Sequence, residues 1–164
     1  MITRVRSREE HIVRLLAGAL ALFISVSIFS PHAEMRVLFL ACLSPKTGNC
    51  TTAERIRNHI VAAGHTCVLC DTREFNSASD VSSLMMQEPR FEAALAIHLF
   101  KGGRLLLDLG VPFGVVFGGT DVNEDVKDEH KRAVMEEVLR KARSNLLCPD
   151  ESCHFILLLC SSQL

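Results

Sequence analysis

The sequence contains no tryptophan and no tyrosine, and it has no excess of basic residues. Its 18 Lys and Arg against 19 Asp and Glu give a formal net charge of -1. Nucleic-acid-binding proteins neutralise phosphates with basic surfaces and stack bases on aromatic rings. Phe is the sole large aromatic residue type here, so we expect no nucleic-acid partner. A GxGxxG fingerprint and a Walker loop are also absent, and we expect no cofactor and no metal ion.

Charge is also missing from residues 15–30 (LLAGALALFISVSIFS), and arginines precede this run. Such a pattern is typical of a secretory signal or a marginal membrane anchor. It predicts secretory-pathway targeting or secretion, with possible membrane contact through residues 15–30. The alternative is a helix without targeting function, in which case the protein is cytoplasmic and Met35 starts the folded domain.

The seven cysteines form no framework that the sequence alone can pair. Cys67 and Cys70 match C-x-x-C, but they lie within an apolar run that predicts a strand. Residues three apart in a strand face opposite sides of the sheet, which suits neither a redox turn nor a zinc site. We therefore expect structural cysteines there. Asn49-Cys50-Thr51 is a glycosylation sequon, although its place beside a candidate site loop argues against its use.

From residue 36 onwards, short apolar runs alternate with helical patterns. Strands are predicted at 36–42, 65–70, 91–98 and 112–117, and helices at 51–64, 80–88, 102–109 and 124–143. A capping box from Thr51 to Glu54 is expected to start the first helix, with Gly64 ending it, and Asp80 to cap the second. Val126, His130, Val134 and Val138 should share one face of the last helix.

This alternation predicts an α/β fold, a Rossmann-like parallel sheet with flanking helices. Length supports a single ordinary domain. We assign an extension to residues 1–34, the domain to 35–143 and a divergent tail to 144–164, which either adds an edge strand or hangs loose.

Ligands bind at the carboxyl ends of the strands in such sheets, so three loops are candidates. The first holds Gly48 and Asn49 before a helix amino terminus, a place that favours phosphate or carboxylate. A plain strand-helix turn is the alternative reading.

The second candidate loop holds His98, Lys101 and Arg104, beside Gly102 and Gly103. The histidine could relay a proton or bind a hydroxyl, and the cations could bind substrate. Alternatively, His98 is a structural residue, hydrogen-bonded at the end of a strand.

The third candidate loop is Gly118, Gly119, Thr120 and Asp121, where paired glycines allow close approach of a ligand. Asp121 either accepts from a ligand hydroxyl or caps the next helix. Together the three loops suit a polar, hydroxyl-rich ligand.

The segments 35–69, 92–106 and 112–125, with GGTDVNED the most specific stretch, resemble retaining GT-B glycosyltransferases of family 4. The resemblance implies two Rossmann-like domains facing a cleft, with the acceptor held by the amino-terminal half and the nucleotide sugar by the other. It places the Gly48 loop at the cleft and His98 near the transferred sugar, as the tentative catalytic residue. Gly118–Asp121 corresponds to an HG-type turn, with Gly here where many relatives have His.

The family's basic pair for the diphosphate and its glutamate motif are not found in this sequence. We therefore expect a glycosyltransferase-family protein represented by its acceptor-side domain, which would transfer hexose from a nucleotide sugar to a glycan or small acceptor, and which is inactive alone. A non-catalytic binding or regulatory form is the alternative. An independent Rossmann nucleotide-binding protein is a third possibility, for which Asp71 is the relevant acid.

Overall fold

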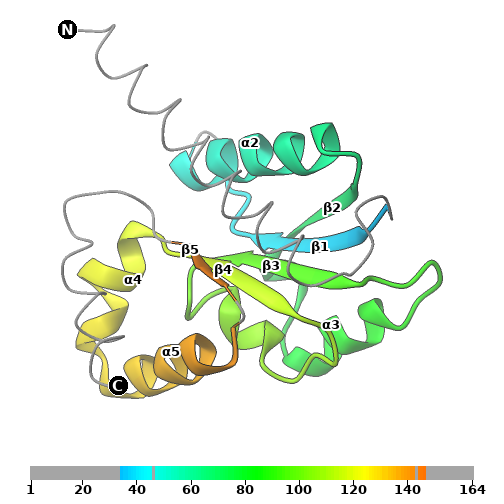
Figure 1. Cartoon of the computed structure of the whole chain (residues 1–164). Coiled ribbons are helices and arrows are strands. Elements are labelled where there is room, and N and C mark those ends of the chain that lie inside the picture. The colour runs from blue at the N-terminus through cyan, green and yellow to red at the C-terminus, as the bar shows by residue number, and fades with distance from the viewer. Residues whose placement is uncertain (1–33, 46, 143, 147–164) are drawn as a thin grey trace, which may run out of the picture.

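The computed structural model describes residues 34–45, 47–142 and 144–146, which form a five-stranded parallel sheet with helices on both faces (Figure 1). This confirms the α/β, Rossmann-like prediction. The strands are β1 (Arg36–Ala41), β2 (Thr66–Asp71), β3 (Ala93–Ile97), β4 (Phe113–Val116) and β5 (Ser144–Leu146). Their order in the sheet is β2-β1-β3-β4-β5, so the chain moves to one side of β1 and then crosses to the other.

Reversal of the strand order creates a switch point between β1 and β3. Val37 pairs with both Cys67 and Ala93, and Ile97 pairs with Val116. In open parallel sheets a ligand crevice lies beyond the carboxyl ends of the strands at this point. The chain therefore places the loops after β1 and β3 next to each other.

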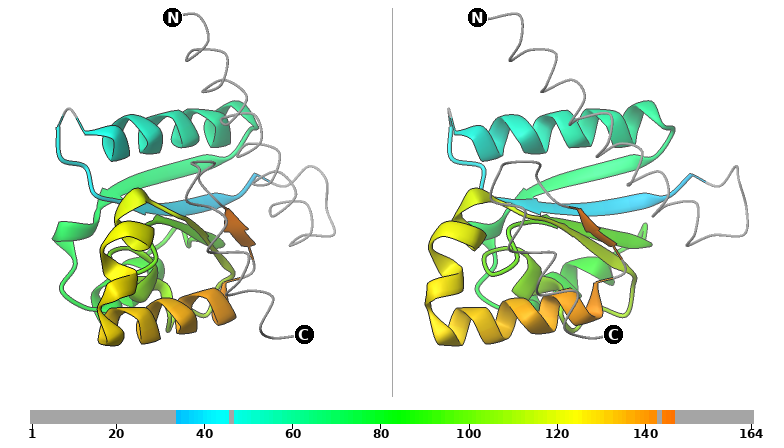
Figure 2. Two further views of the ribbon diagram at one scale, coloured as in Figure 1. Left: turned by 90° about the vertical axis from the view of Figure 1, so that its left-hand side faces the viewer. Right: turned by 60° about the vertical axis from the view of Figure 1, so that its left-hand side comes forward.

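Helices cover the two faces of the sheet with separate cores (Figures 1 and 2). On one face α2 (Gly48–Ala62) packs Ala53, Ile56 and Ile60 against Phe39. The opposite face carries α3 (Ala78–Met85) and α5 (Glu129–Lys141), whose buried residues form a second core with Leu38 and Leu40 of β1. The remaining elements are α4 (Gly119–Asn123), η1 (Thr72–Glu74), η2 (Gly103–Leu106) and η3 (Asp125–Lys127).

The first helix begins earlier than the sequence indicated, so the predicted capping box at Thr51 is wrong. Thr47 is the N-cap: its hydroxyl accepts from the N–H of Cys50 at 3.4 Å and donates to the carbonyl of Ser44 at 2.7 Å. The earlier start takes Gly48 and Asn49 from a loop into the first turn of α2. Gly64 follows the helix with φ 90°, as predicted.

Other helix boundaries also shift. Ser77, not Asp80, caps α3, and Asp80 completes the capping box by accepting from the N–H of Ser77. The helix expected at 102–109 is a short 3-10 turn. The long helix expected at 124–143 is divided at Asp128, whose side chain caps α5. His130 consequently lies in the first turn of α5 and is exposed, instead of sharing the buried face with Val138.

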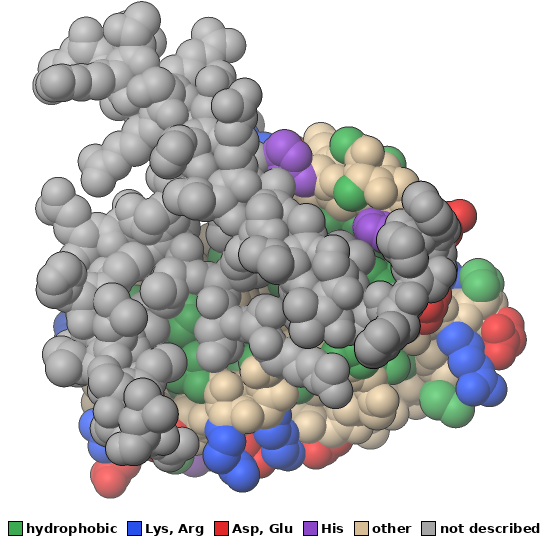
Figure 3. Space-filling model, in the orientation of Figure 1, with side chains coloured by type: hydrophobic (Ala, Val, Ile, Leu, Met, Phe, Trp, Pro, Cys, Tyr) green, Lys and Arg blue, Asp and Glu red, His purple; other side chains and the backbone are tan. Residues whose placement is uncertain are grey.

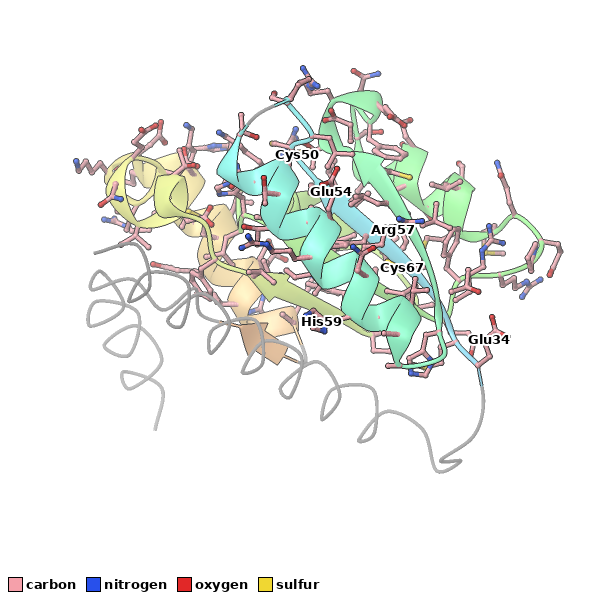
Figure 4. All side chains as sticks on the ribbon, turned by 90° about the horizontal axis from the view of Figure 1, so that it is seen from above. Glu34, Cys50, Glu54, Arg57, His59 and Cys67 are labelled. Atoms are coloured by element: carbon pink, nitrogen blue, oxygen red, sulfur yellow. The ribbon has the colours of Figure 1, made fainter. Side chains whose placement is uncertain are left out.

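Cys67 and Cys70 lie on opposite faces of β2, which confirms their prediction as structural residues. Cys67 is buried beneath α2, next to Arg57 in Figure 4, and Cys70 packs against the core of the other face. Burial raises the pKa of the Cys67 thiol to about 12, although the charge of Arg57 opposes the increase. Burial also raises the pKa of Cys70.

On the face shown in Figure 3, Lys and Arg side chains lie beside Asp and Glu side chains along the lower margin. No helix within residues 34–45, 47–142 and 144–146 is long and apolar enough to cross a membrane. The predicted signal or anchor at 15–30 and most of the tail lie outside the described residues. β5, from Ser144 to Leu146, adds an edge strand beside β4.

Candidate functional site

The candidate site lies at the carboxyl edge of the sheet, where the structure brings His98 together with two of the predicted loops. Asn49 in the first turn of α2 contacts the ring from one side, and Gly118 and Asp121 contact it from the loop after β4. These residues are 72 positions apart at their extremes, and the parallel strand order alone brings them together. The site residues thus converge on one buried imidazole.

His98 has an unusual backbone conformation, with φ 71°, whereas every other described residue with positive φ is glycine. Its N–H donates to the carbonyl of Val116 at 2.9 Å, and its carbonyl accepts from Gly102 and Gly103 at 3.1 and 2.8 Å. A left-handed conformation costs a non-glycine residue about 1–2 kcal/mol. These hydrogen bonds hold it in place, and strain of this kind is often concentrated at functional sites.

The imidazole ring is packed against backbone and is almost fully buried, with 1% of the residue exposed. A Cβ at Gly118 would lie 2.0 Å from ring atom Cε1 and 2.3 Å from Nδ1. Glycine is therefore required because the ring occupies the place of a side chain. Gly118 has φ -108° and ψ 161°, a conformation open to any residue, so the requirement is purely one of space.

Two polar groups flank the ring nitrogens. Nδ2 of Asn49 lies 2.9 Å from Nε2 of His98 and donates to it. Nδ1 lies 3.3 Å from Oδ2 of Asp121 but is not aligned for a hydrogen bond. A carboxylate at Nδ1 favours the proton on that nitrogen, which leaves Nε2 as the acceptor. A ligand group that reaches Nε2 in this state must be a donor, such as a hydroxyl, and an anion is disfavoured.

Asp121 is buried and joins the two loops. Oδ1 accepts from the N–H of Leu99 at 3.0 Å, and Oδ2 accepts from the N–H of Gly118 at 2.9 Å. Hydrogen bonds from buried N–H groups to a carboxylate are strong and orient both loops around the ring. Asp121 is not the N-cap of the next helix, because Gly118 is the N-cap of α4. Asp121 lies in the first turn of α4 and supplies the carboxylate half of a capping box, as Asp80 does in α3.

The basic residues after His98 lie on the exterior of the 3-10 turn. Lys101 and Arg104 are exposed, and the guanidinium of Arg104 lies 5.7 Å from the centroid of the Phe100 ring. Lys131 from α5 lies 5.2 Å from the same ring. Both cations are within the range of a cation–π interaction. Arg104 therefore has a structural contact besides its predicted role toward substrate.

Gly102 and Gly103 are tightly packed, not flexible. A Cβ at Gly102 would lie 2.6 Å from the carbonyl oxygen of Ile97, and one at Gly103 would lie 2.7 Å from Val138. Because neither residue has a side chain, the turn can fold back closely on the end of β3. Both glycines therefore support the left-handed turn at His98.

The remaining predicted residues border the site. Gly48 and Gly119 are exposed, and Thr120 is half-buried. A side chain at Gly48 would meet nothing within 4 Å. Asn49 is half-buried, and the amide nitrogen that a glycan would occupy in the sequon is the donor to His98.

Sequence reasoning did not assign the residues after β2 to the site. Asp71 ends β2 and forms an ion pair with Arg73, with Nη2 and Oδ2 2.6 Å apart. Hydrogen bonding to the Arg73 guanidinium holds the pKa of the Asp71 carboxyl below its ordinary value. Thr72 lies 3.2 Å from the thiol of Cys42, oxygen to sulfur. An acid at the end of the second strand can bind a ribose in dinucleotide proteins, but here Arg73 occupies it.

Metal binding has no obvious place in this part of the chain. Within the described residues, no three His, Cys, Asp or Glu side chains gather as a metal ion would require.

Comparison with known proteins gives a relative for this domain. The chain is 56% identical over 109 residues to glycosyltransferase 1 domain-containing protein 1 of Xenopus tropicalis. The match covers 66% of this chain and 31% of the Xenopus protein, so the chain spans about a third of the length of that relative. No family model matches the chain, and no solved structure matches it. Over these 109 residues the chain is similar to glycosyltransferase 1 domain-containing protein 1, and this identity, together with the Rossmann-like sheet, supports a link to the glycosyltransferase-family proteins.

Proposed function

We propose that this chain provides the acceptor-side domain of a glycosyltransferase, which transfers a hexosyl group from a nucleotide sugar to a glycan or small-molecule acceptor. The supporting observation is the convergence of Asn49, His98 and Gly118 at the switch point of the sheet. An imidazole acceptor at Nε2 suits a hydroxyl-bearing ligand. The name of the Xenopus relative supports the reaction class.

We further propose that the 164-residue chain transfers no sugar by itself. Transfer requires the donor and the acceptor to be held in one geometry. The chain corresponds to 31% of its relative, and donor binding would require elements that correspond to the rest of it.

A domain-exchange experiment tests both proposals. The matching 109 residues of the Xenopus protein are replaced by those of this chain, and release of nucleoside diphosphate is measured over a panel of nucleotide sugars and acceptors. We expect turnover by the Xenopus protein and by the chimera, and none by the isolated chain. Turnover by the isolated chain would contradict its proposed inactivity. An inactive chimera beside an active parent would contradict the transferase role.

A non-catalytic binding module is the second candidate. Nε2 of His98 already accepts a hydrogen bond from Asn49, so it is not free to accept a proton during sugar transfer. A glycan array probed with the isolated chain and with His98→Ala separates the two. Retained glycan binding that disappears in His98→Ala supports a binding module. Its absence, together with an active chimera, leaves the transferase role.

Independent nucleotide binding has less support, because Arg73 already neutralises Asp71. A thermal shift with NAD and with nucleotide sugars tests it: stabilisation by NAD alone would favour this candidate.

Targeting is a separate proposal that concerns residues 1–34. We propose that they direct the chain to the secretory pathway and that residues 15–30 contact the membrane. Fusion of residues 1–34 to a reporter, with and without residues 15–30, tests it. If the reporter fused to the whole of residues 1–34 remains in the cytoplasm, the proposal is refuted.

A further inference from the structure

His98 lies where a ligand is expected to bind, but its side chain is not accessible to solvent. It lies at the edge of the sheet where ligands bind, yet only 1% of the residue is exposed. Two residues that contact the ring, Gly118 and Asp121, have fixed positions in the fold. Gly118 packs against the ring, and the Asp121 carboxylate accepts from two backbone N–H groups. Neither group can withdraw without breaking the loop after β4.

Asn49 differs from these fixed groups. It is half-buried and lies at the second position of α2, next to the exposed Gly48. The helix start is maintained by Thr47 and does not use the Asn49 side chain. Rotation of that side chain would therefore break its hydrogen bond to Nε2 and leave the helix intact.

We propose that Asn49 is an internal occupant of the His98 site, which any ligand that binds Nε2 must displace. The amide supplies the hydrogen bond that Nε2 accepts in the free protein. This makes Asn49 a gating residue that determines access to His98. The inference concerns the isolated chain and holds whether or not the chain takes part in sugar transfer.

Acylation of histidines by diethyl pyrocarbonate tests access, because the reagent requires an accessible ring nitrogen with a free lone pair. Mass spectrometry of peptides follows His98 beside His59 and His130, which are both exposed and serve as internal references. We expect His98 in the wild-type chain to react much more slowly than either reference. Equal rates in the wild type would overturn the proposal.

Asn49→Ala should accelerate modification of His98 by roughly fivefold to tenfold, the factor that corresponds to the loss of one neutral hydrogen bond. The matched control is Asn58→Ala, an exposed asparagine on the same helix, which should leave the rate unchanged. An unchanged His98 rate in folded Asn49→Ala would overturn the proposal, because another group would then close the site.

Amide hydrogen exchange of β3 verifies the fold of each variant. If Asn49→Ala exposes β3, Asn49→Ser replaces it, with the same acceleration expected.

Discussion

Replacing Gly118 with alanine introduces a methyl group where the imidazole of His98 lies. The new Cβ would be 2.0, 2.3 and 2.7 Å from three ring atoms. Ordinary contact between carbon atoms is about 3.5–4.0 Å, so the ring or the loop must move by roughly 1.5 Å. The ring cannot move freely, because Asn49 and the left-handed backbone of His98 hold it.

Overpacking of a buried site costs about 1–3 kcal/mol, and a buried polar group that loses its partner costs a further 1–3 kcal/mol. Alanine gains about 0.4–1 kcal/mol over glycine through the unfolded state, because the conformation of Gly118 suits both residues. We therefore expect a net destabilisation of about 2–4 kcal/mol, equivalent to a decrease in Tm of about 8–16 °C for a domain of this size.

Thermal and urea unfolding followed by circular dichroism measures this effect. Gly110→Ala is the matched control, because a Cβ there meets nothing within 4 Å, and it should not be destabilised; the unfolded-state effect should raise its stability by at most about 1 kcal/mol. His98→Gly removes the ring while permitting the positive φ. In that background Gly118→Ala should cost little. Equal melting of Gly118→Ala and Gly110→Ala would refute the reasoning, as would an undiminished cost of Gly118→Ala after removal of the ring.

Three further predictions concern the other buried groups. Asp121→Asn should destabilise the chain by about 1–3 kcal/mol, because an amide cannot accept from both Leu99 and Gly118, whereas exposed Asp108→Asn should have little effect in the same urea titration. Cys67 should resist iodoacetamide at pH 8, since its pKa of about 12 leaves almost no thiolate, while partly exposed Cys50 is alkylated; peptide mass spectrometry measures both, and equal labelling in the native chain would contradict the assigned burial. Asp71→Asn should be less stable than the wild type at pH 7. Because the pKa of Asp71 is depressed in the folded chain, this difference persists above its ordinary value of 3.8 and declines as the pH falls through the folded value; a difference that does not change between pH 7 and pH 2 would exclude the ion pair as its cause.

Much of the fold could be predicted from local patterns. The apolar runs gave four strands within a few residues of their observed bounds, because strands buried on both faces have few polar residues. Helix starts were less predictable. Thr47 and Thr51 are both plausible caps, and which hydroxyl accepts an N–H depends on where the chain leaves β1.

The site shows the same division. The sequence indicated His98, Asn49, Gly118 and Asp121 as neighbours of strand ends, since each follows an apolar run. It did not indicate that Asp121 is buried with both oxygens engaged, or that the ring of His98 lies over Gly118. Those are contacts between segments that are distant in the sequence, and no local pattern encodes them.

By itself, the sequence determined the alternation of strands and helices, the structural nature of Cys67 and the resemblance to a glycosyltransferase family, because these depend on periodicity and on residue identity. The tertiary structure decided what each candidate residue does. Parallel pairing of β1, β3 and β4 brings Asn49, His98 and Asp121 to one edge of the sheet. There Gly118 packs against the ring of His98, Asp121 holds the two loops together, and the Asn49 amide donates to the ring. Roles of this kind depend on distances in space, which the order of residues does not contain.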